Sequence, residues 1–309
     1  MIGERARTPI VVGVPGGASR PTTLDAPVRW AAREALIRGV PLWLVHAFLP
    51  SYGSPLSTGG TGWTGTSGSI RADGDELGAA AHRAVRCLEQ VASQLAAEYP
   101  ELSVAMFARC GATVAVLSDI AGDAALLVVG RHSHGRVAQA VLGSVAAGCP
   151  REPSSPVVAV PARGGGHAAP GAPIVVGVDA EGPAPETLGF VFAEALVRGA
   201  PLRFLHCHGP GAATGERWLA MVDALTPYRA AFPSVAMTAE IVDGEPAEIL
   251  VKESVTASLL VLGPGDGWTA GWRLGRLGEV GHEVLCQSAG PVVLVREAAH
   301  NPAGAVRSR

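Results

Sequence analysis

The sequence lacks the features that mark membrane, secreted or disordered proteins. No apolar run approaches the roughly 18 residues of a membrane-spanning helix, because Gly, Pro or charged residues interrupt every run. The N-terminal segment also lacks a long apolar stretch, so we expect no signal peptide. Hydrophobic residues make up 48% and charged residues 17% of the 309 residues, which excludes disorder of the whole chain. We therefore expect a cytoplasmic protein without a membrane partner.

Cysteine and net charge are also low. The five cysteines include no Cys-x-x-Cys pair, a distribution that favours reduced thiols over a disulfide framework. The formal net charge is −3, and binding to nucleic acid normally requires a concentrated basic face. We therefore expect no nucleic-acid partner.

The sequence motifs of common nucleotide-dependent enzymes are missing as well. There is no P-loop lysine, and the first predicted strand is not followed by G-x-G-x-x-G. The second predicted strand does not end in an acidic residue, and no Ser-His-Asp or metal-ligand spacing is visible. We predict a protein that is not an enzyme, with no catalytic residues and no metal site.

What the sequence does contain is an internal repeat. Four segments recur in the same order: residues 9–14 return as 173–178, 34–42 as 194–202, 126–130 as 259–263, and 156–160 as 291–295. Four ordered matches indicate a duplicated unit. We predict a first domain over residues 1–161, a linker over 162–172, a second domain over 173–299 and a flexible tail over 300–309.

Short Val, Ile and Leu runs alternate with longer helical patterns in each copy. The first copy predicts strands at 10–14, 42–48, 103–109, 126–130 and 156–160, with helices at 27–38, 76–98, 113–122 and about 143–151. The second predicts strands near 173–178, 202–206, 235–242, 259–263 and 291–295. Apolar strands that alternate with helices are typical of parallel sheets. We predict an α/β fold of two tandem, doubly wound, five-stranded parallel sheets flanked by helices.

Two other features of the repeat lead to predictions. The second strand of each copy runs to a histidine, His46 and His206, and we expect each to bond a backbone carbonyl rather than to act in catalysis. Residues 50–75 form a long loop rich in Gly, Ser and Thr, which the second copy replaces with a short one. A loop of this length is usually functional or disordered, and here we favour disorder.

A glycine-containing loop follows the fourth strand of the first copy. It runs from Gly130 to Ser144 as Gly-Arg-His-Ser-His-Gly-Arg-Val-Ala-Gln-Ala-Val-Leu-Gly-Ser. Ligands of open parallel sheets bind beyond the carboxyl ends of the strands, where strand order reverses. Glycines let backbone N–H groups approach an anion, and a helix that begins after this loop would add a partial positive charge. The loop therefore predicts a phosphate site.

This loop resembles the nucleotide loop of the universal stress protein family, G-x2-G-x9-G-[S/T], with Ser133 in place of the middle glycine. The resemblance covers nearly the whole chain twice and implies the adenine nucleotide alpha hydrolase-like fold. It also implies a crevice for ATP or another adenine nucleotide, with Mg²⁺. The implied contacts in the first copy are Val14, Pro15, Gly130, Arg131, Ser133, Gly143, Ser144 and Val145. In the second copy they are Asp179, Gly263 and Gly278.

Both copies depart from the family pattern. Family members usually carry an acidic residue directly after the first strand, where it contacts the nucleoside. The first copy has Pro15 there, which offers neither a carboxylate nor an N–H group. The second copy keeps Asp179, which could bind a ribose hydroxyl or stabilise the following turn, but Glu279 occupies the Ser/Thr place and would repel a phosphate. We therefore expect a degenerate crevice in both copies.

Further departures lie around these loops. Pro150 would break or kink the helix after Ser144. Trp268 and Trp272 could stack on a base, although we favour their filling of a vacated crevice. His132 and His134 could contact phosphate, but on a polar loop we expect them to be solvated.

Two functions remain open from the sequence. The first is a non-enzymatic cytoplasmic stress-response protein with an adenine-nucleotide crevice. The second is a stress-related interaction or scaffold protein that has lost nucleotide binding. Because family members typically dimerise through their last strands, the resemblance implies that Pro156–Val160 and Pro291–Val295 pair within the chain as a pseudo-dimer, with a homodimer as a further form of self-association.

Overall fold

The computed structural model describes residues 8–16, 24–49, 74–122, 124–131, 155–162, 169, 171–179, 182–208, 214–263 and 278–295. The predicted helix at 143–151, the loop at 50–73 and most of the predicted linker and tail lie outside these residues. Among the described residues, no helix combines the length and apolar character needed to cross a membrane.

Each half contains five parallel strands, as the alternating pattern predicts. The first half has β1 (Ile10–Gly13), β2 (Leu42–Phe48), β3 (Val104–Cys110), β4 (Leu126–Arg131) and β5 (Val157–Pro161). The second has β6 (Ile174–Val178), β7 (Leu202–His208), β8 (Met237–Asp243), β9 (Leu259–Leu262) and β10 (Val292–Leu294). Predicted and observed ends differ by at most two residues at every strand, which is ordinary uncertainty at element ends.

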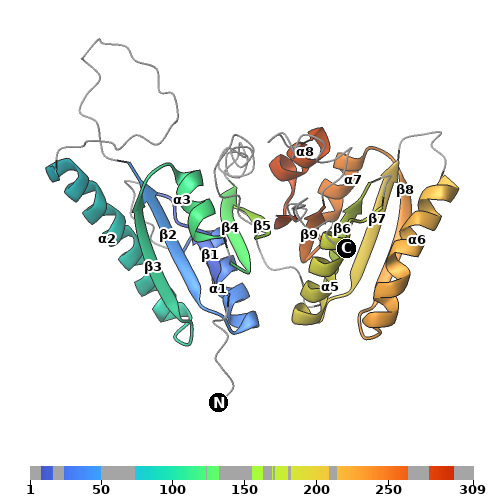
Figure 1. Cartoon of the computed structure of the whole chain (residues 1–309), viewed down its shortest axis with the longest axis horizontal. Coiled ribbons are helices and arrows are strands. Elements are labelled where there is room, and N and C mark those ends of the chain that lie inside the picture. Colours follow the sequence, from blue (N-terminus) through green and yellow to red (C-terminus); the bar gives the residue numbers. More distant parts are fainter. Residues whose placement is uncertain are drawn as a thin grey trace, which may run out of the picture.

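The two five-stranded units join into one ten-stranded sheet. Its strand order is β3-β2-β1-β4-β5-β10-β9-β6-β7-β8, and β5 runs antiparallel to β10, with Val158 opposite Val293. The other strand pairs are parallel. The expected pairing of the two terminal strands within the chain is therefore confirmed. It places the halves side by side, with the described helices lying along the shared sheet (Figure 1).

Seven helices are described, and two of them end at a repeated glycine. The first half has α1 (Ala26–Arg38), α2 (Gly74–Glu98) and α3 (Thr113–Ile120); the second has α5 (Pro185–Arg198), α6 (Thr214–Ala231), α7 (Pro246–Glu253) and α8 (Glu279–Gln287). Gly39 and Gly199 end α1 and α5 in the left-handed conformation that glycine adopts readily. The helix predicted at 76–98 begins two residues earlier, and the one predicted at 113–122 ends two residues earlier.

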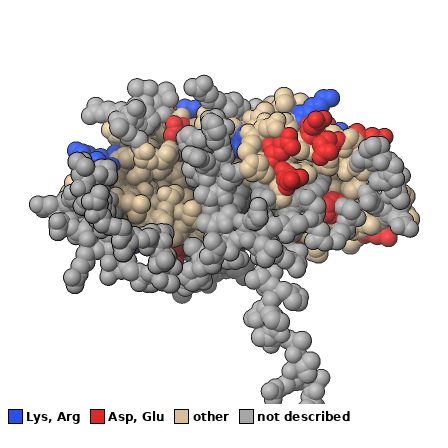
Figure 2. Space-filling view, turned by 90° about the horizontal axis from the view of Figure 1, so that it is seen from above, with Lys and Arg blue, Asp and Glu red and all other residues tan. Residues whose placement is uncertain are grey.

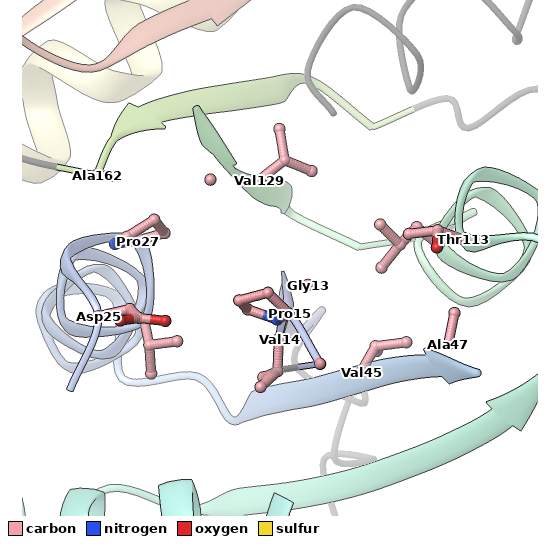
Figure 3. Close-up of a pocket in the computed structure, with 14 residues that line it drawn as sticks. Gly13, Val14, Pro15, Asp25, Pro27, Val45, Ala47, Thr113, Val129 and Ala162 are labelled. Carbon is pink, nitrogen blue, oxygen red and sulfur yellow. The ribbon is translucent and has the colours of Figure 1, made fainter. Parts of the chain in front are cut away.

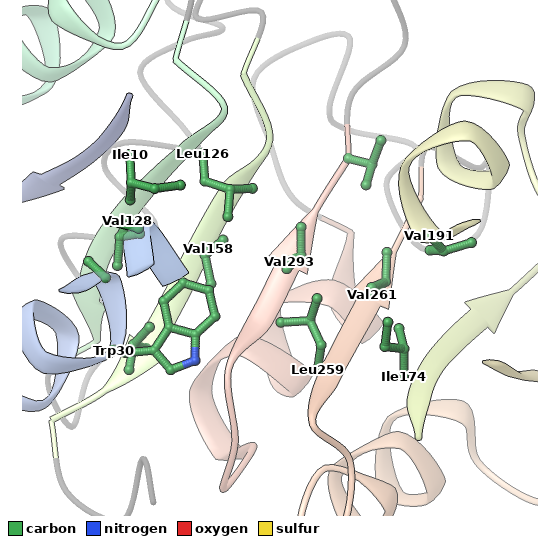
Figure 4. Close-up of a cluster of buried hydrophobic side chains, with 14 of the residues drawn as sticks. Ile10, Trp30, Leu126, Val128, Val158, Ile174, Val191, Leu259, Val261 and Val293 are labelled. Carbon is green, nitrogen blue, oxygen red and sulfur yellow. The ribbon is translucent and has the colours of Figure 1, made fainter. Parts of the chain in front are cut away.

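The hydrophobic core continues across the join between the halves. Successive strand residues point to opposite faces, so Ile10 and Val12 belong to one buried cluster and Val11 to the other. Figure 4 shows Val158 of the first half beside Val293 of the second, with Trp30 next to Val158. Burial of both faces explains why the strands read as continuous apolar runs.

A buried ion-pair network, formed by Glu34, Arg38, Glu194 and Arg198, connects α1 and α5 where the halves meet. Arg38 bonds Glu194 at 2.7 Å and Glu34 at 3.2 Å, while Arg198 bonds Glu34 at 2.8 Å and Glu194 at 3.0 Å. The four side chains are between 3% and 12% exposed. All four belong to the repeated Glu-Ala-Leu-x-Arg-Gly segment. Equivalent residues of the two copies therefore contact each other, as in a symmetric dimer.

Candidate functional site

The first half contains a cavity of about 280 Å³ at the carboxyl ends of β1 and β4. Strand order reverses between these two strands, because β1 continues to β2 on one side and β4 to β5 on the other. The cavity therefore lies at the place where ligands of open parallel sheets bind (Figure 3). Its lining residues are Gly13, Val14, Pro15, Gly16, Asp25, Pro27, Val28, Val45, Ala47, Thr113, Leu117, Val129, Gly130 and Ala162.

The walls of the cavity are held in place by short backbone and side-chain contacts. The Nδ1 atom of His46 lies 2.8 Å from the Val14 carbonyl oxygen, and Val14 N–H bonds the Val45 carbonyl at 2.8 Å. The expected carbonyl-binding role of His46 is confirmed. Gly16 is required beside this histidine, because a Cβ at that position would lie 2.7 Å from His46 Cε1.

Pro15 lies at the mouth of the cavity, over the α2 helix. The Cys87 thiol donates to the Pro15 carbonyl oxygen at 3.8 Å. Burial raises the pKa of the Cys87 thiol, and the nearby Asp25 carboxylate raises it further. Cys87 therefore remains a neutral thiol under the site and is not poised as a nucleophile.

Two charged or polar side chains face the cavity from helix ends. Asp25 precedes α1, and Thr113 is the first residue of α3. Figure 3 shows these two residues on opposite sides of the space, with Gly13, Val14 and Pro15 between them. Sequence reasoning missed both. An aspartate followed by Ala-Pro at a helix start was the available signal for Asp25.

The predicted first-half residues separate into three groups. Val14, Pro15 and Gly130 line the cavity. Ser133, Gly143, Ser144 and Val145 lie outside the described residues, as do His132, His134 and Pro150. Arg131 is described but is not among the residues that line the cavity.

Arg131 reaches across to the second half. It is the last residue of β4 and is 7% exposed, and its guanidinium donates to the Ser288 carbonyl oxygen after α8. Burial lowers the pKa of Arg131, with a smaller opposing effect from Cys286. The family resemblance implied that Arg131 contacts a nucleotide, but in the structure Arg131 contacts the second half.

The second half has the same strands but almost no cavity. The corresponding space measures about 10 Å³ and is lined by Gly177, Asp179, Gly182, Pro183, Ala184, Thr187 and Gly263. Thr187 fills it, because a Cβ at Gly263 would collide with the Thr187 hydroxyl. Of the predicted residues, Asp179 and Gly263 line this space, whereas Gly278 precedes α8 and does not.

Other second-half predictions have mixed outcomes. His206 Nδ1 lies 3.0 Å from the Val178 carbonyl, which confirms the role expected by analogy with His46. The Asp179 carbonyl accepts a bond from Gly182 N–H at 3.4 Å, closing a turn after β6. Glu279 begins α8, which places a carboxylate in its first turn. Trp268 and Trp272 lie outside the described residues.

Charge differs between the two upper surfaces. Seen onto the carboxyl ends of the strands, acidic residues gather over the second half, while the described surface of the first half is mainly uncharged (Figure 2). Within the described residues, no three His, Cys, Asp or Glu side chains are grouped so that they could hold a metal ion. On the described surface, an anionic ligand therefore meets fewer acidic side chains over the first half than over the second.

Comparisons with known proteins agree with the repeat and the fold. The profile of the universal stress protein family matches residues 8–161. A universal stress protein from Mycobacterium tuberculosis strain H37Rv is 31% identical over 303 residues, covering 93% of this chain and 97% of that protein. Another from the same strain is 28% identical over 320 residues, covering 96% and 97%.

A solved structure shows the same fold over both halves. A universal stress protein from Archaeoglobus fulgidus has a TM-score of 0.62 and 15% sequence identity, covering 94% of this chain and 97% of that one. The sequence relatives likewise extend through the whole tandem arrangement. The chain belongs to the universal stress protein family.

Proposed function

We propose that this protein is a non-enzymatic, cytoplasmic stress-response protein that binds an adenine nucleotide in its first half alone. The observation that carries the proposal is the cavity of about 280 Å³ at the strand-order reversal, against about 10 Å³ in the second half. Membership of the universal stress protein family supports the stress-response role.

The chemistry of the cavity supports a flat, partly apolar ligand such as a nucleoside. Val45, Leu117 and Val129 provide apolar walls, and the backbone at Gly13 and Gly130 lets a ligand approach closely. The volume is near the lower end of ordinary ligand sites, about 300–1,000 Å³. It therefore suits the nucleoside portion, with the phosphates lying outside the described part of the site.

The test is calorimetric titration of the full chain with ATP, with and without Mg²⁺. We expect binding in the micromolar range to the wild type, and at least tenfold weaker binding to Ala47→Leu, because the larger side chain occupies the cavity. Phe48→Leu is the matched control, since Phe48 neighbours Ala47 but does not line the cavity.

The closed second half favours a second candidate, a scaffold that no longer binds nucleotides. Its α6 helix exposes apolar side chains, with Trp218 40% and Leu219 61% exposed. Absence of binding by a folded wild type up to millimolar ATP would overturn the nucleotide proposal and favour this scaffold role.

A further inference from the structure

Among the described residues that line the first-half cavity, Asp25 has the single ionisable side chain. Thr113 has the one other polar side chain in this described lining, and the rest of it is glycine, alanine, valine, leucine and proline. In a site with apolar walls, isolated polar groups determine the orientation and selectivity of a ligand. Asp25 is therefore the strongest candidate for a selectivity determinant.

The local sequence explains why this carboxylate is available. An aspartate at the N-cap of a helix normally accepts a hydrogen bond from the N–H of the second or third helical residue. Here the second residue of α1 is Pro27, which has no N–H, and the Asp25 side chain makes no capping bond. Among the described residues, none forms a hydrogen bond or ion pair with this carboxylate.

The direction of the side chain fits a role toward a ligand. Figure 3 shows the Asp25 carboxylate turned toward Pro15 across the cavity. Asp25 is also exposed, so its charge remains hydrated in the free protein. A hydrated, unpaired carboxylate can exchange water for ligand donors without breaking a protein contact.

The chemistry of a carboxylate limits which ligand groups can lie beside it. Its two oxygens accept hydrogen bonds and repel anions, so a phosphate is unfavourable there. Two neighbouring hydroxyls match the two oxygens, and carboxylates bind ribose hydroxyls in other α/β nucleotide sites. A carboxylate that accepts from a neutral donor also forms a strong, charge-assisted bond.

We propose that Asp25 binds the 2′- and 3′-hydroxyls of the nucleotide's ribose and makes the first-half site selective for ribonucleotides. This inference rests on the proposed function, because it assumes a nucleotide in the cavity. It places the sugar beside the start of α1 and the phosphates away from Asp25. It also assigns the ligand-binding carboxylate to the start of α1, since Pro15, where family members usually carry an acid, has none.

The experiment compares ATP, 2′-deoxy-ATP and 2′,3′-dideoxy-ATP by calorimetry with the wild-type chain, Asp25→Asn and Asp25→Ala. Hydrogen bonds to a charged group correspond to about ten- to hundredfold in affinity, so the wild type should prefer ATP over the dideoxy compound by that factor. In Asp25→Ala the preference should fall to about twofold, and Asp25→Asn should lie between. Glu101→Ala is the control, because Glu101 is an exposed acid just before β3, at the amino end of the sheet.

The outcomes separate this inference from the proposed function. If ATP binds the wild type but its preference over dideoxy-ATP survives in Asp25→Ala, the role of Asp25 is overturned and nucleotide binding stands. Tighter ATP binding by Asp25→Ala would also overturn it, since Asp25 would then lie near phosphate. No binding of any nucleotide by the folded wild type would overturn both. Thermal unfolding of each variant verifies that it is folded.

Discussion

The two halves keep the same scaffold but differ in the space at the strand ends. Their strands pair in the same registers, and the His46 and His206 rings bond the equivalent carbonyls of Val14 and Val178. Yet the cavity measures about 280 Å³ in the first half and about 10 Å³ in the second. Because the strand registers and the histidine contact are shared, the difference lies in the side chains and in the loops that line the space. The loop between the first strand and the first helix is one such difference, since it spans residues 14–25 in the first half and only 179–184 in the second.

Several lining residues are larger or more polar in the second half. Val45 and Val129 correspond to Leu205 and Leu262, Ala47 to Cys207, and Pro27 to Thr187. Both leucines are fully buried. A few added atoms are enough to close a small cavity, because interiors are packed nearly to crystal density. Two copies of one fold can therefore differ in this cavity while both keep a packed core.

Both halves contribute equivalent residues to the buried ion-pair network, so they should contribute equally to its stability. Glu34→Ala should lower the free energy of unfolding by about 3–5 kcal/mol, because it leaves two buried arginines with one carboxylate. Glu194→Ala should have an equal effect, within about 1 kcal/mol. Denaturant unfolding of the full chain measures both.

The matched control for this network is Glu98→Ala. Glu98 pairs with Arg29 on the surface, where the side chains are 35% and 39% exposed, and such pairs contribute less than about 1 kcal/mol. Clearly unequal effects of the two network variants would show that the halves do not share this contact equally. Effects as small as that of the control would show that the network does not hold the halves together.

Local sequence patterns predicted most of the fold, because they act over short distances. Strands β1 and β6 are buried on both faces, so each is a continuous apolar run that predicts a strand. The matching positions of His46 and His206 indicated that both bond a backbone carbonyl. The pairing of β5 with β10 followed from the family resemblance. The repeated Glu and Arg positions of the network were visible, but their contact required the relative placement of α1 and α5.

The candidate site was less predictable, because it depends on contacts between distant segments. Asp179 follows β6 where the family pattern places an acid, yet Thr187 leaves almost no space beside it. Arg131 reads as a loop cation but contacts Ser288, 157 residues away. Asp25 belongs to no motif, and its proposed role depends on a side chain that makes no capping bond, beside a proline that removes one of the two possible donors.

The second prediction exchanges the cavity residues of the halves. Val45→Leu with Val129→Leu should weaken ATP binding at least tenfold, because the two added methylenes occupy the first-half space. The reverse change, Leu205→Val with Leu262→Val, should leave binding unchanged. It should lower stability by about 1–3 kcal/mol, as each removed methylene leaves a void in a packed core. Calorimetry and denaturant unfolding measure the two effects.

This exchange tests whether side-chain volume causes the difference in cavity size between the halves. Unchanged ATP affinity in the filled first half would place the binding determinants elsewhere. If the leucine-to-valine variant gained ATP binding in the second half, side-chain volume alone would be what closes the second-half space. Thr187 and the acidic surface would then not prevent binding.

The smallest expected effect concerns the outer strands of the sheet, where the halves use different chemistry. In the first half, Trp43 and Phe107 pack with ring centroids 4.8 Å apart. The corresponding positions in the second half hold Arg203 and Glu240, which bond at 2.9 Å. This pair is partly exposed, so it should contribute less than about 1 kcal/mol.

Because one pair is ionic and the other apolar, pH should affect the second half alone at these positions. The hydrogen bond from Arg203 lowers the pKa of Glu240, so its stabilising effect is present above about pH 4.3, the ordinary glutamate value, and is lost as pH falls through the lowered pKa. Glu240→Gln should therefore differ from the wild type at pH 7 and converge with it in acid, as denaturant midpoints would show. Trp43→Phe should shift the midpoint by the same amount at every pH. If the midpoint difference between Glu240→Gln and the wild type stayed the same at every pH, Glu240 would act through packing. The two outer edges would then differ in shape and not in charge.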